Sequence, residues 1–382
     1  MRIGFDAKRA FNNFTGLGNY SRTLIETLAH YYPKNEYHLF TPKLNQNPRL
    51  DFIKSYPSVS VHFPTGIKRT LHPLWRSYCI KEDIKKHQID IFHGLSHELP
   101  FRLPKNVKTV VTIHDLIHER FPEFYPFIDR KIYSWKFKSA CERADIVVAI
   151  SEATKQDIMD FYHIDSNKIK VIYQSCHSQF YQNTSNNTDF KNKYNLPEKY
   201  LLYVGTVNER KNLLSLVKAL QIIDNQLDMK LVVIGEGGDY FQKVKRFVID
   251  NKMENRVLFY NHIPFSDFPT LYKYAQAMVL PSFFEGFGIP IIEALWSGCP
   301  VITSEGSCFA EAGGPDSIYI NPHNIKDIAE AIERVTTDQN LRKQMILRGG
   351  QFVQKFHEKH IGAQWEKLYK EMMNEKFNVK GA

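Results

Sequence analysis

The chain has 382 residues, of which 43% are hydrophobic and 24% charged, and its formal net charge is +9. This balance is typical of a folded soluble protein and excludes a disordered chain, and the length suits two domains better than one core. No apolar run approaches the roughly 20 residues that a membrane-spanning helix needs, and the first residues form an apolar strand instead of a signal peptide, so we predict a cytoplasmic protein.

The five cysteines give no sign of a metal site or a disulfide framework. They are Cys79, Cys141, Cys176, Cys299 and Cys308, scattered along the chain without any C-x-x-C spacing. We therefore expect reduced thiols in a reducing compartment.

Apolar strands and amphipathic helices alternate through the N-terminal half. Strands are expected near residues 2–6, 37–40, 59–63, 89–92, 109–113 and 146–150, and helices near 15–32, 75–87 and 155–162. This alternation predicts a parallel sheet covered by helices on both faces, which is a Rossmann-like α/β domain. Ligands bind at the carboxyl ends of strands in such sheets, and there the sequence places a glycine loop with Gly16 and Gly18, and also His114.

A second series of the same kind follows a polar stretch. Residues 181–195 are the most loop-like part of the chain and are predicted to link two domains. Beyond them, strands are expected near 200–205, 231–234, 257–260, 277–280, 301–304 and 318–320, and helices near 325–335, 340–356 and 358–374. Arg210 and Lys211 precede the first helix of this series, where the helix dipole disfavours cations, so a bound diphosphate is expected between them and the loop at 286–288.

The stretch from Pro281 to Ser304 is the most informative part of the sequence. It predicts a strand end, a glycine loop with Gly286 and Gly288, a short helix with Pro290 in its first turn, and another strand. A helix that starts behind a glycine loop is a site for an anion. Glu285 and Glu293 frame this site and have no basic neighbour in the sequence, so we expect them to accept hydrogen bonds from hydroxyl groups. Phosphate and hydroxyls together indicate a nucleotide sugar.

This stretch resembles the signature of the family 4 retaining glycosyltransferases, in which seven residues separate two glutamates around a Gly-Phe-Gly-x-Pro core. The resemblance extends from the first glycine loop to the last helix. It implies the GT-B architecture, in which two Rossmann-like domains face each other across a cleft, with residues 1–180 forming the acceptor-side domain and 195–357 the nucleotide-sugar domain. The helix in 358–382 would pack back on the first domain.

The resemblance also implies roles for individual residues. His114 would lie at the donor sugar, Glu285 would bind sugar hydroxyls, and Arg210 and Lys211 would neutralise the leaving diphosphate, so that no metal and no cofactor is needed. Glu293 would hold the ribose, and backbone groups near His262 and Ile263 would contact the nucleotide base. The predicted donor-binding residues are Gly16, Gly18, Gly205, Gly235, His262, Ile263, Phe284, Gly286, Phe287, Gly288, Ile289 and Glu293. The family's arginine normally follows the glycine, whereas Thr206 follows Gly205 here, and we assign that role to Arg210.

Each of these residues also has a purely structural interpretation. Gly16 and Gly18 suit a simple tight turn, and His114 suits a histidine that hydrogen-bonds within the fold. Arg210 and Lys211 suit a solvated basic pair, and the loop before Pro290 suits an ordinary helix cap with solvated glutamates.

Two stretches combine basic and aromatic residues in the N-terminal half, which carries 26 Lys and Arg against 18 Asp and Glu in residues 1–180. They span residues 68–86 and 121–143. Such a mixture predicts peripheral contact with an anionic membrane, at the inner face of the plasma membrane, where a polyprenyl-diphosphate-linked acceptor would be found. Solvated helix faces are the alternative, and no nucleic-acid motif accompanies the charge.

The resemblance is strongest to bacterial mannosyltransferase-type members that build surface polysaccharide. We therefore expect transfer of a hexose, with mannose favoured, from a nucleoside-diphosphate sugar to a glycan or lipid-linked oligosaccharide with retention at the anomeric carbon. A nucleotide-sugar epimerase of the same architecture and a non-catalytic subunit that binds sugar nucleotides are the alternatives.

Overall fold

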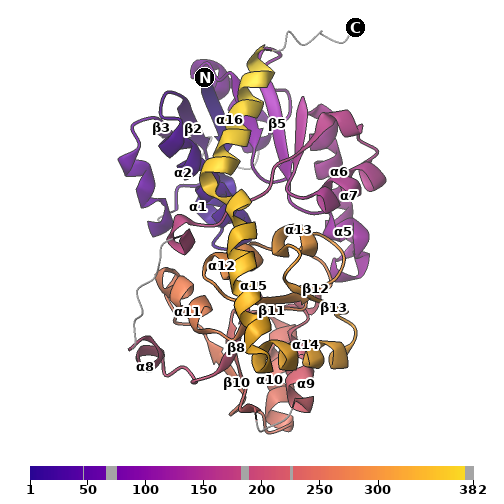
Figure 1. Ribbon diagram of the computed structural model, residues 1–382. Coiled ribbons are helices and arrows are strands. Elements are labelled where there is room, and N and C mark those ends of the chain that lie inside the picture. The colour runs from indigo at the N-terminus through magenta and orange to yellow at the C-terminus, as the bar shows by residue number, and fades with distance from the viewer. Residues whose placement is uncertain (46, 66–74, 182–188, 224–226, 375–382) are drawn as a thin grey trace. The chain divides into compact units, whose positions relative to one another are not determined.

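The computed structural model describes residues 1–45, 47–65, 75–181, 189–223 and 227–374. The chain forms two compact units, each built around its own parallel sheet (Figure 1). The first unit consists of Met1–Ser175 and the chain from Phe356 onward, and the second of Cys176–Lys355. This confirms the predicted class, an α/β protein with two Rossmann-like domains.

Seven parallel strands form the sheet of the first unit. Their order is β3-β2-β1-β4-β5-β6-β7, and Ile3 at the centre pairs with Tyr37 on one side and Ile91 on the other. The strands are β1 (Arg2–Asp6), β2 (Glu36–Phe40), β3 (Val59–His62), β4 (Ile91–Gly94), β5 (Lys108–Ile113), β6 (Ile146–Ala149) and β7 (Ile169–Val171).

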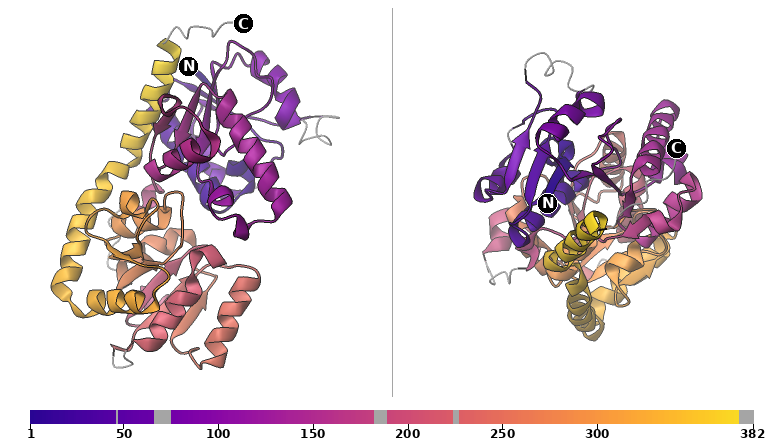
Figure 2. Two further views of the ribbon diagram at one scale, coloured as in Figure 1. Left: turned by 90° about the vertical axis from the view of Figure 1, so that its right-hand side faces the viewer. Right: turned by 90° about the horizontal axis from the view of Figure 1, so that it is seen from above.

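Helices cover both faces of this sheet, as the left view of Figure 2 shows. They are α1 (Lys8–Asn12), α2 (Gly16–Tyr31), α4 (Ile80–Lys86), α5 (Ile117–Arg120), α6 (Phe127–Arg143), α7 (Glu152–Tyr162) and α16 (Glu358–Asn374). On the central strands, Val110 packs into the core under α2 and α16, whereas its neighbour Val111 packs into the core under α4, α6 and α7. Successive strand residues point to opposite faces, so a strand buried on both sides is apolar throughout.

The helix α16 belongs to the first unit although it comes from the end of the chain. It packs along α2, where Gly362 leaves room for Thr27, since a Cβ at 362 would lie 2.8 Å from the Thr27 methyl carbon. Trp365 and Tyr369 are fully buried, and the Tyr369 hydroxyl lies 2.8 Å from Nδ1 of His93 on β4. This helix therefore completes one hydrophobic core of the unit.

Six parallel strands form the sheet of the second unit, in the order β10-β9-β8-β11-β12-β13. They are β8 (Tyr200–Val204), β9 (Lys230–Ile234), β10 (Val257–Tyr260), β11 (Ala277–Leu280), β12 (Val301–Ser304) and β13 (Ile318–Ile320). The helices are α8 (Phe190–Tyr194), α9 (Leu213–Ile222), α10 (Asp239–Asp250), α11 (Phe268–Tyr274), α12 (Ile289–Trp296), α13 (Phe309–Gly313), α14 (Ile325–Thr337) and α15 (Gln339–Phe352). One core packs α9, α10 and α14 against the sheet.

A few segments differ from the sequence-based expectation. Residues 8–12 form a short helix that is not among the expected ones, and the helix expected from Trp75 begins with a π-helical turn, Trp75–Cys79, before α4. Within the polar stretch 181–195, residues 190–194 are helical, while 182–188 lie outside the described residues. All five cysteines are free, as predicted. Among the described residues, no helix has both the length and the apolar character to cross a membrane.

Candidate functional site

The strands β8 and β9 end at two glycines whose backbones are in contact. Gly205 and Gly235 have φ angles of +147° and +153°, and a Cβ at 235 would lie 1.9 Å from the carbonyl oxygen of Gly205. No side chain fits at position 235, so this glycine is required for the two loops to meet. The carboxyl edge of the sheet is thus lined by bare backbone next to β11, where a ligand can approach closely.

The loop between β11 and α12 has the predicted form. Gly288, with φ +97°, precedes the helix, Pro290 occupies its first turn, and Gly298, with φ +70°, follows its end. Phe284 and Phe287 are buried, which explains why the loop is apolar where a solvent-exposed cap would be polar. The amino end of α12 therefore starts from a fixed, packed loop.

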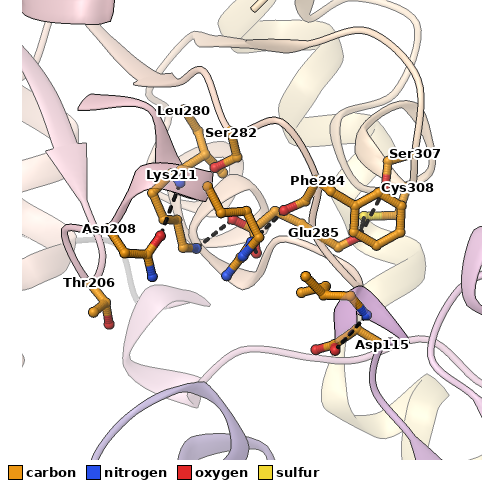
Figure 3. A network of polar contacts seen from close by, with 12 residues as sticks. Asp115, Thr206, Asn208, Lys211, Leu280, Ser282, Phe284, Glu285, Ser307 and Cys308 are labelled. Carbon is orange, nitrogen blue, oxygen red and sulfur yellow. Dashed lines mark hydrogen bonds and ion pairs between the residues drawn. The ribbon is translucent and has the colours of Figure 1, made fainter. Parts of the chain in front are cut away.

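Glu285 on this loop binds two cations from the segment after β8 (Figure 3). Its Oε2 lies 2.9 Å from Nη1 of Arg210, and its Oε1 lies 2.5 Å from Nζ of Lys211. Arg210 also donates to the carbonyl oxygen of Phe284, and its own carbonyl accepts from the Phe283 N–H at 2.8 Å. The expectation that no basic residue neutralises Glu285 is wrong, because both partners come from a distant part of the sequence.

The charges of this triad strongly perturb its pKa values. Burial alone would raise the pKa of the Glu285 carboxyl, but the charges and hydrogen bonds of Arg210 and Lys211 outweigh it and bring the pKa to about 2. Burial lowers the pKa of the Lys211 ammonium, and Arg210 adds to this, while Glu285 acts in the opposite direction. Glu285 is therefore ionised at neutral pH, and its charge favours the protonated lysine.

Arg210 and Lys211 lie in a 3-10 turn, Glu209–Lys211, that precedes α9. Asn208 caps this turn, since its side chain accepts the Lys211 N–H at 3.1 Å. Asn212, with φ +56°, donates from its side chain to the carbonyls of Pro281 and Pro322 at 3.1 and 2.8 Å. The turn is thereby tied to the β11 loop, and the cations are not a solvated pair, which was the alternative interpretation.

The second glutamate, Glu293, is buried within α12. It accepts a hydrogen bond from the Tyr272 hydroxyl at 3.0 Å, so the hydroxyl that it binds in this structure comes from the protein, and its contact with a ribose stays a prediction. Ile289 in the first turn is half-buried. On the loop after β10, His262 is exposed and Ile263 half-buried. β10 is an edge strand, separated from β8 by β9.

Several residues that the sequence did not single out contribute to the loop around Glu285. The Ser307 hydroxyl and the Cys308 thiol donate to the Glu285 carbonyl oxygen at 2.9 and 3.1 Å. The hydroxyl of Ser282 is buried and makes no hydrogen bond. The left-handed Asn212 could have been found from its position at a helix start, but a buried serine leaves no signal in the sequence.

Of the predicted residues of the first unit, Gly16 and Gly18 lie in the first turn of α2, and His114 directly follows β5. Gly18 is in contact with Asn13, since a Cβ at 18 would lie 1.9 Å from the Asn13 carbonyl oxygen, whereas Gly16 has open space around it. The side chain of Asn13 accepts the N–H of Gly18 at 3.1 Å and that of Thr15 at 2.9 Å. Gly18 is therefore needed for the turn itself, as in the structural alternative.

His114 is buried, and both of its ring nitrogens have partners in the protein. Nε2 lies 2.8 Å from the Leu95 carbonyl oxygen, and Nδ1 lies 3.1 Å from the side-chain nitrogen of Gln174. This arrangement fits a neutral ring that donates from Nε2 and accepts at Nδ1. Burial and the neighbouring His97 lower the pKa of His114 to about 3. The structure thus gives this histidine a role within the fold, and its contact with a sugar stays a prediction.

Comparisons with known proteins agree with this architecture. The family described as Glycosyltransferase Family 4 matches residues 14–177, and that described as Glycosyl transferases group 1 matches residues 184–351. The chain is 28% identical over 367 residues to O-antigen chain mannosyltransferase B of Escherichia coli, covering 91% of this chain and 94% of that protein. It is 32% identical over 227 residues to O-antigen chain mannosyltransferase RfbU of Salmonella typhimurium, covering 59% and 60%.

Solved structures share the fold over the whole chain. Anabaena Alr3699/HepE in complex with UDP and glucose superposes with a TM-score of 0.76 at 17% identity, covering 97% of this chain and 100% of that one. A glycosyltransferase from Rickettsia africae gives a TM-score of 0.74 at 19% identity, covering 98% of both chains. Together with the two family matches, two parallel α/β units of this form identify a glycosyltransferase of the GT-B class. The chain belongs to family 4 of the glycosyltransferases.

Proposed function

We propose that the chain transfers a hexose, with mannose favoured, from a nucleoside-diphosphate sugar to a glycan or lipid-linked oligosaccharide acceptor in cell-surface polysaccharide synthesis, with retention and without a metal ion. The relatives named above are O-antigen mannosyltransferases, which supports mannose as the sugar and surface polysaccharide as the product. Membership of a glycosyltransferase family favours a transferase over the epimerase and the non-catalytic subunit.

The observation that carries the proposal is the pair of cations, Arg210 and Lys211. They lie beside the glycine edge, which is the backbone of Gly205 and Gly235 at the carboxyl ends of β8 and β9. Lys211 Nζ lies 3.8 Å from the place where a Cβ of Gly205 would stand, so the ammonium faces the bare backbone at the end of β8. An ammonium has three N–H donors, and one carboxylate oxygen of Glu285 accepts one of them. A diphosphate bound at this edge would meet Lys211, Arg210 and the amino end of α12.

This arrangement supports a reaction in which cationic side chains of the protein stabilise the leaving group. When the glycosidic bond to the nucleoside diphosphate breaks, negative charge develops on the leaving phosphate. Preorganised cations in a site shielded from water stabilise that charge without a cost of reorganisation, which is the role that a divalent ion has in other transferases. The charge of Glu285 favours the protonated form of Lys211, and we propose that its carboxylate also binds hydroxyls of the donor sugar.

The remaining assignments of the resemblance are part of the same proposal. Glu293 would hold the ribose hydroxyls, the backbone at His262 and Ile263 would contact the base, and His114 would contact the donor sugar. Such a contact at Nδ1 of His114 would replace its hydrogen bond to Gln174, because a neutral ring has one acceptor nitrogen.

The helix α6 supports peripheral contact with an anionic membrane. Phe127, Ile128, Ile132 and Trp135 are exposed, and the 3.6-residue period places them on one side of the helix together with Lys131. An exposed apolar stripe that includes a cation suits the interface of an anionic bilayer, where a lipid-linked acceptor would lie. In the other stretch, residues 66–74 lie outside the described residues, and Arg76 is not a surface cation because it is buried in ion pairs with Asp6 and Glu98.

The test is a transfer assay with GDP-mannose, UDP-glucose and UDP-galactose, each with a mannosylated polyprenyl-diphosphate acceptor and each in the presence of EDTA. We expect transfer from GDP-mannose to persist with EDTA, and the anomeric proton of the product to show the configuration of the donor by NMR. Activity that EDTA abolishes and Mg²⁺ or Mn²⁺ restores would contradict the metal-independent part, and an inverted product would contradict retention. Transfer from a UDP-sugar alone would replace mannose as the favoured sugar.

A further inference from the structure

Three histidines from separate parts of the first unit come together at one edge of its sheet. His38 lies on β2, His62 lies at the end of the edge strand β3, and His87 follows the end of α4. The register pairs His38 with Ser60, so the side chains of His38, Ser60 and His62 share one face of the sheet. The ring centroids of His62 and His87 are 4.0 Å apart, and that of His38 is 5.2 and 5.5 Å from them.

One ring nitrogen of each histidine lies near those of the other two. One ligand atom from each histidine lies within 4.8 Å of the others, and among the described residues this is the one group of three or more such side chains. Nδ1 of His38 lies 2.9 Å from Nε2 of His62, and the Ser60 hydroxyl lies 3.1 Å from both atoms. Two imidazole nitrogens at this distance share one proton, and a metal ion can take the place of that proton.

Nδ1 is the nitrogen of His38 that lies at His62. The other nitrogen, Nε2, is buried without a hydrogen bond, and Oε2 of Glu36 lies 3.6 Å from it.

We propose that His38, His62 and His87 bind one divalent ion of the zinc class. Three imidazole ligands with water in the fourth position are a common set for Zn²⁺, which takes nitrogen at about 2.0–2.1 Å, and small side-chain rotations would bring the three nitrogens to that distance. Hard ions such as Mg²⁺ prefer oxygen ligands and do not suit this set. The three histidines are distinct from the residues to which donor binding is assigned, so this ion has no part in the transfer reaction.

The bound ion would stabilise the edge of the sheet. β3 is an edge strand, and all four of its residues are only half-buried. An ion bound by β2, β3 and the end of α4 would join three elements that the chain connects only through long segments. Binding to the folded state alone raises its stability in proportion to the logarithm of the ion concentration.

The experiment titrates Zn²⁺ into the full chain after treatment with EDTA and dialysis, at pH 7.5. Bound zinc is measured by mass spectrometry of metals after gel filtration, and the melting temperature by thermal shift. His62→Gln and His87→Gln remove one imidazole each and keep a hydrogen-bonding side chain. His360→Gln, at an exposed position on α16, is the matched control.

We expect one zinc per chain for the wild type and the control, with a melting temperature that rises as zinc is added. Each cluster variant should weaken binding by about 10-fold or more, since the loss of one ligand leaves only two imidazoles. Co²⁺ bound to the wild type should show the visible absorption of a tetrahedral site, and the cluster variants should lose it. Less than 0.5 zinc per chain at saturation, or equal binding by the cluster variants and the control, would overturn the proposal, and the cluster would then be held by hydrogen bonds alone.

Discussion

The Nζ atom of Lys211 lies 2.5 Å from Oε1 of Glu285, and both side chains are almost entirely shielded from solvent. The contact joins the segment after β8 to the loop after β11, two neighbouring strands of one sheet. A buried ion pair of this kind costs desolvation, and its removal on one side leaves a buried charge without a partner. The following predictions about the donor site start from this pair.

Glu285→Gln should abolish most transfer while the chain still binds nucleoside diphosphate. The amide keeps the size of the side chain, but it removes the charge that faces the two cations and the strong acceptor proposed for the sugar hydroxyls. We expect turnover to fall by about 100-fold or more, as for the loss of one preorganised electrostatic group, and the dissociation constant for GDP to change by less than about 10-fold. Glu330→Gln, on the exposed side of α14, is the matched control. Equal losses of turnover and GDP affinity would contradict this separation of roles.

The same variant should change how stability depends on pH. The folded-state pKa of Glu285 is lowered from 4.5 to about 2, so its ionised form stabilises the fold by about 3 kcal/mol above pH 4.5. This contribution is lost as the pH falls from about 4.5 towards 2. The difference in free energy of unfolding between the wild type and Glu285→Gln, from urea curves, should therefore be constant from pH 5 to 7 and shrink below pH 4.5. A constant difference down to pH 2.5 would mean that Glu285 is not held ionised by its neighbours.

Lys211→Gln should weaken binding of the nucleoside diphosphate. The lysine supplies one of the two cations at the glycine edge, and a charge-assisted hydrogen bond to a phosphate contributes about 1.5–3 kcal/mol, which corresponds to about 10- to 100-fold in affinity. Isothermal titration with GDP and UDP measures the change, and Lys326→Gln at an exposed position of α14 serves as control. Unchanged affinity for both nucleotides would remove Lys211 from the proposed diphosphate site.

Gly235→Ala should disrupt the contact between the ends of β8 and β9. The new methyl group would lie 1.9 Å from the Gly205 carbonyl oxygen, and φ is +153°, so the backbone has to move. We expect a loss of about 2 kcal/mol or more in the free energy of unfolding, together with weaker nucleotide binding. Gly238→Ala is the matched control, because its Cβ meets no atom within 4 Å. Equal stability of the two variants would show that the loops can separate without cost.

The apolar face of α6 should bind anionic vesicles. Replacement of Phe127 and Trp135 by Ser removes two large exposed side chains, of which Trp135 is 58% exposed, with little effect on the core. Flotation with vesicles that contain phosphatidylglycerol should show strong binding of the wild type and loss in the double variant, while Leu347→Ser, at an exposed site on α15, keeps it. High salt should weaken binding in part, since lysines contribute through charge. Equal binding by all three proteins would mean that another surface contacts the membrane.

Most of the fold could be predicted because buried parallel strands are continuous apolar runs. The strand expected at 231–234 is found at Lys230–Ile234, and that expected at 277–280 is found at Ala277–Leu280. The short helix Lys8–Asn12 could not be predicted, because its sequence has no amphipathic repeat long enough to distinguish it from a loop.

The residues of the candidate site could be named from the sequence, but their partners could not. The motif around Glu285 identified the loop and the helix, whereas its ion pairs with Arg210 and Lys211 are tertiary contacts between segments that the sheet order brings together. The same holds for His114, whose partners Leu95 and Gln174 lie on other loops. His38, His62 and His87 have no ligand spacing in the sequence and become neighbours only through the register of β2 and β3 and the place where α4 ends.

Because α16 belongs to the first unit, the residues of the two units become complete at different times during synthesis. All residues of the second unit, Cys176–Lys355, are consecutive, so it can fold while the ribosome is still adding the end of the chain. The first unit is made earlier, but its core is incomplete until Trp365 and Tyr369 have been added. Tyr369 also forms a hydrogen bond with His93. The portion that emerges first from the ribosome thus needs a segment that is made much later, with Trp365 and Tyr369, to complete its core.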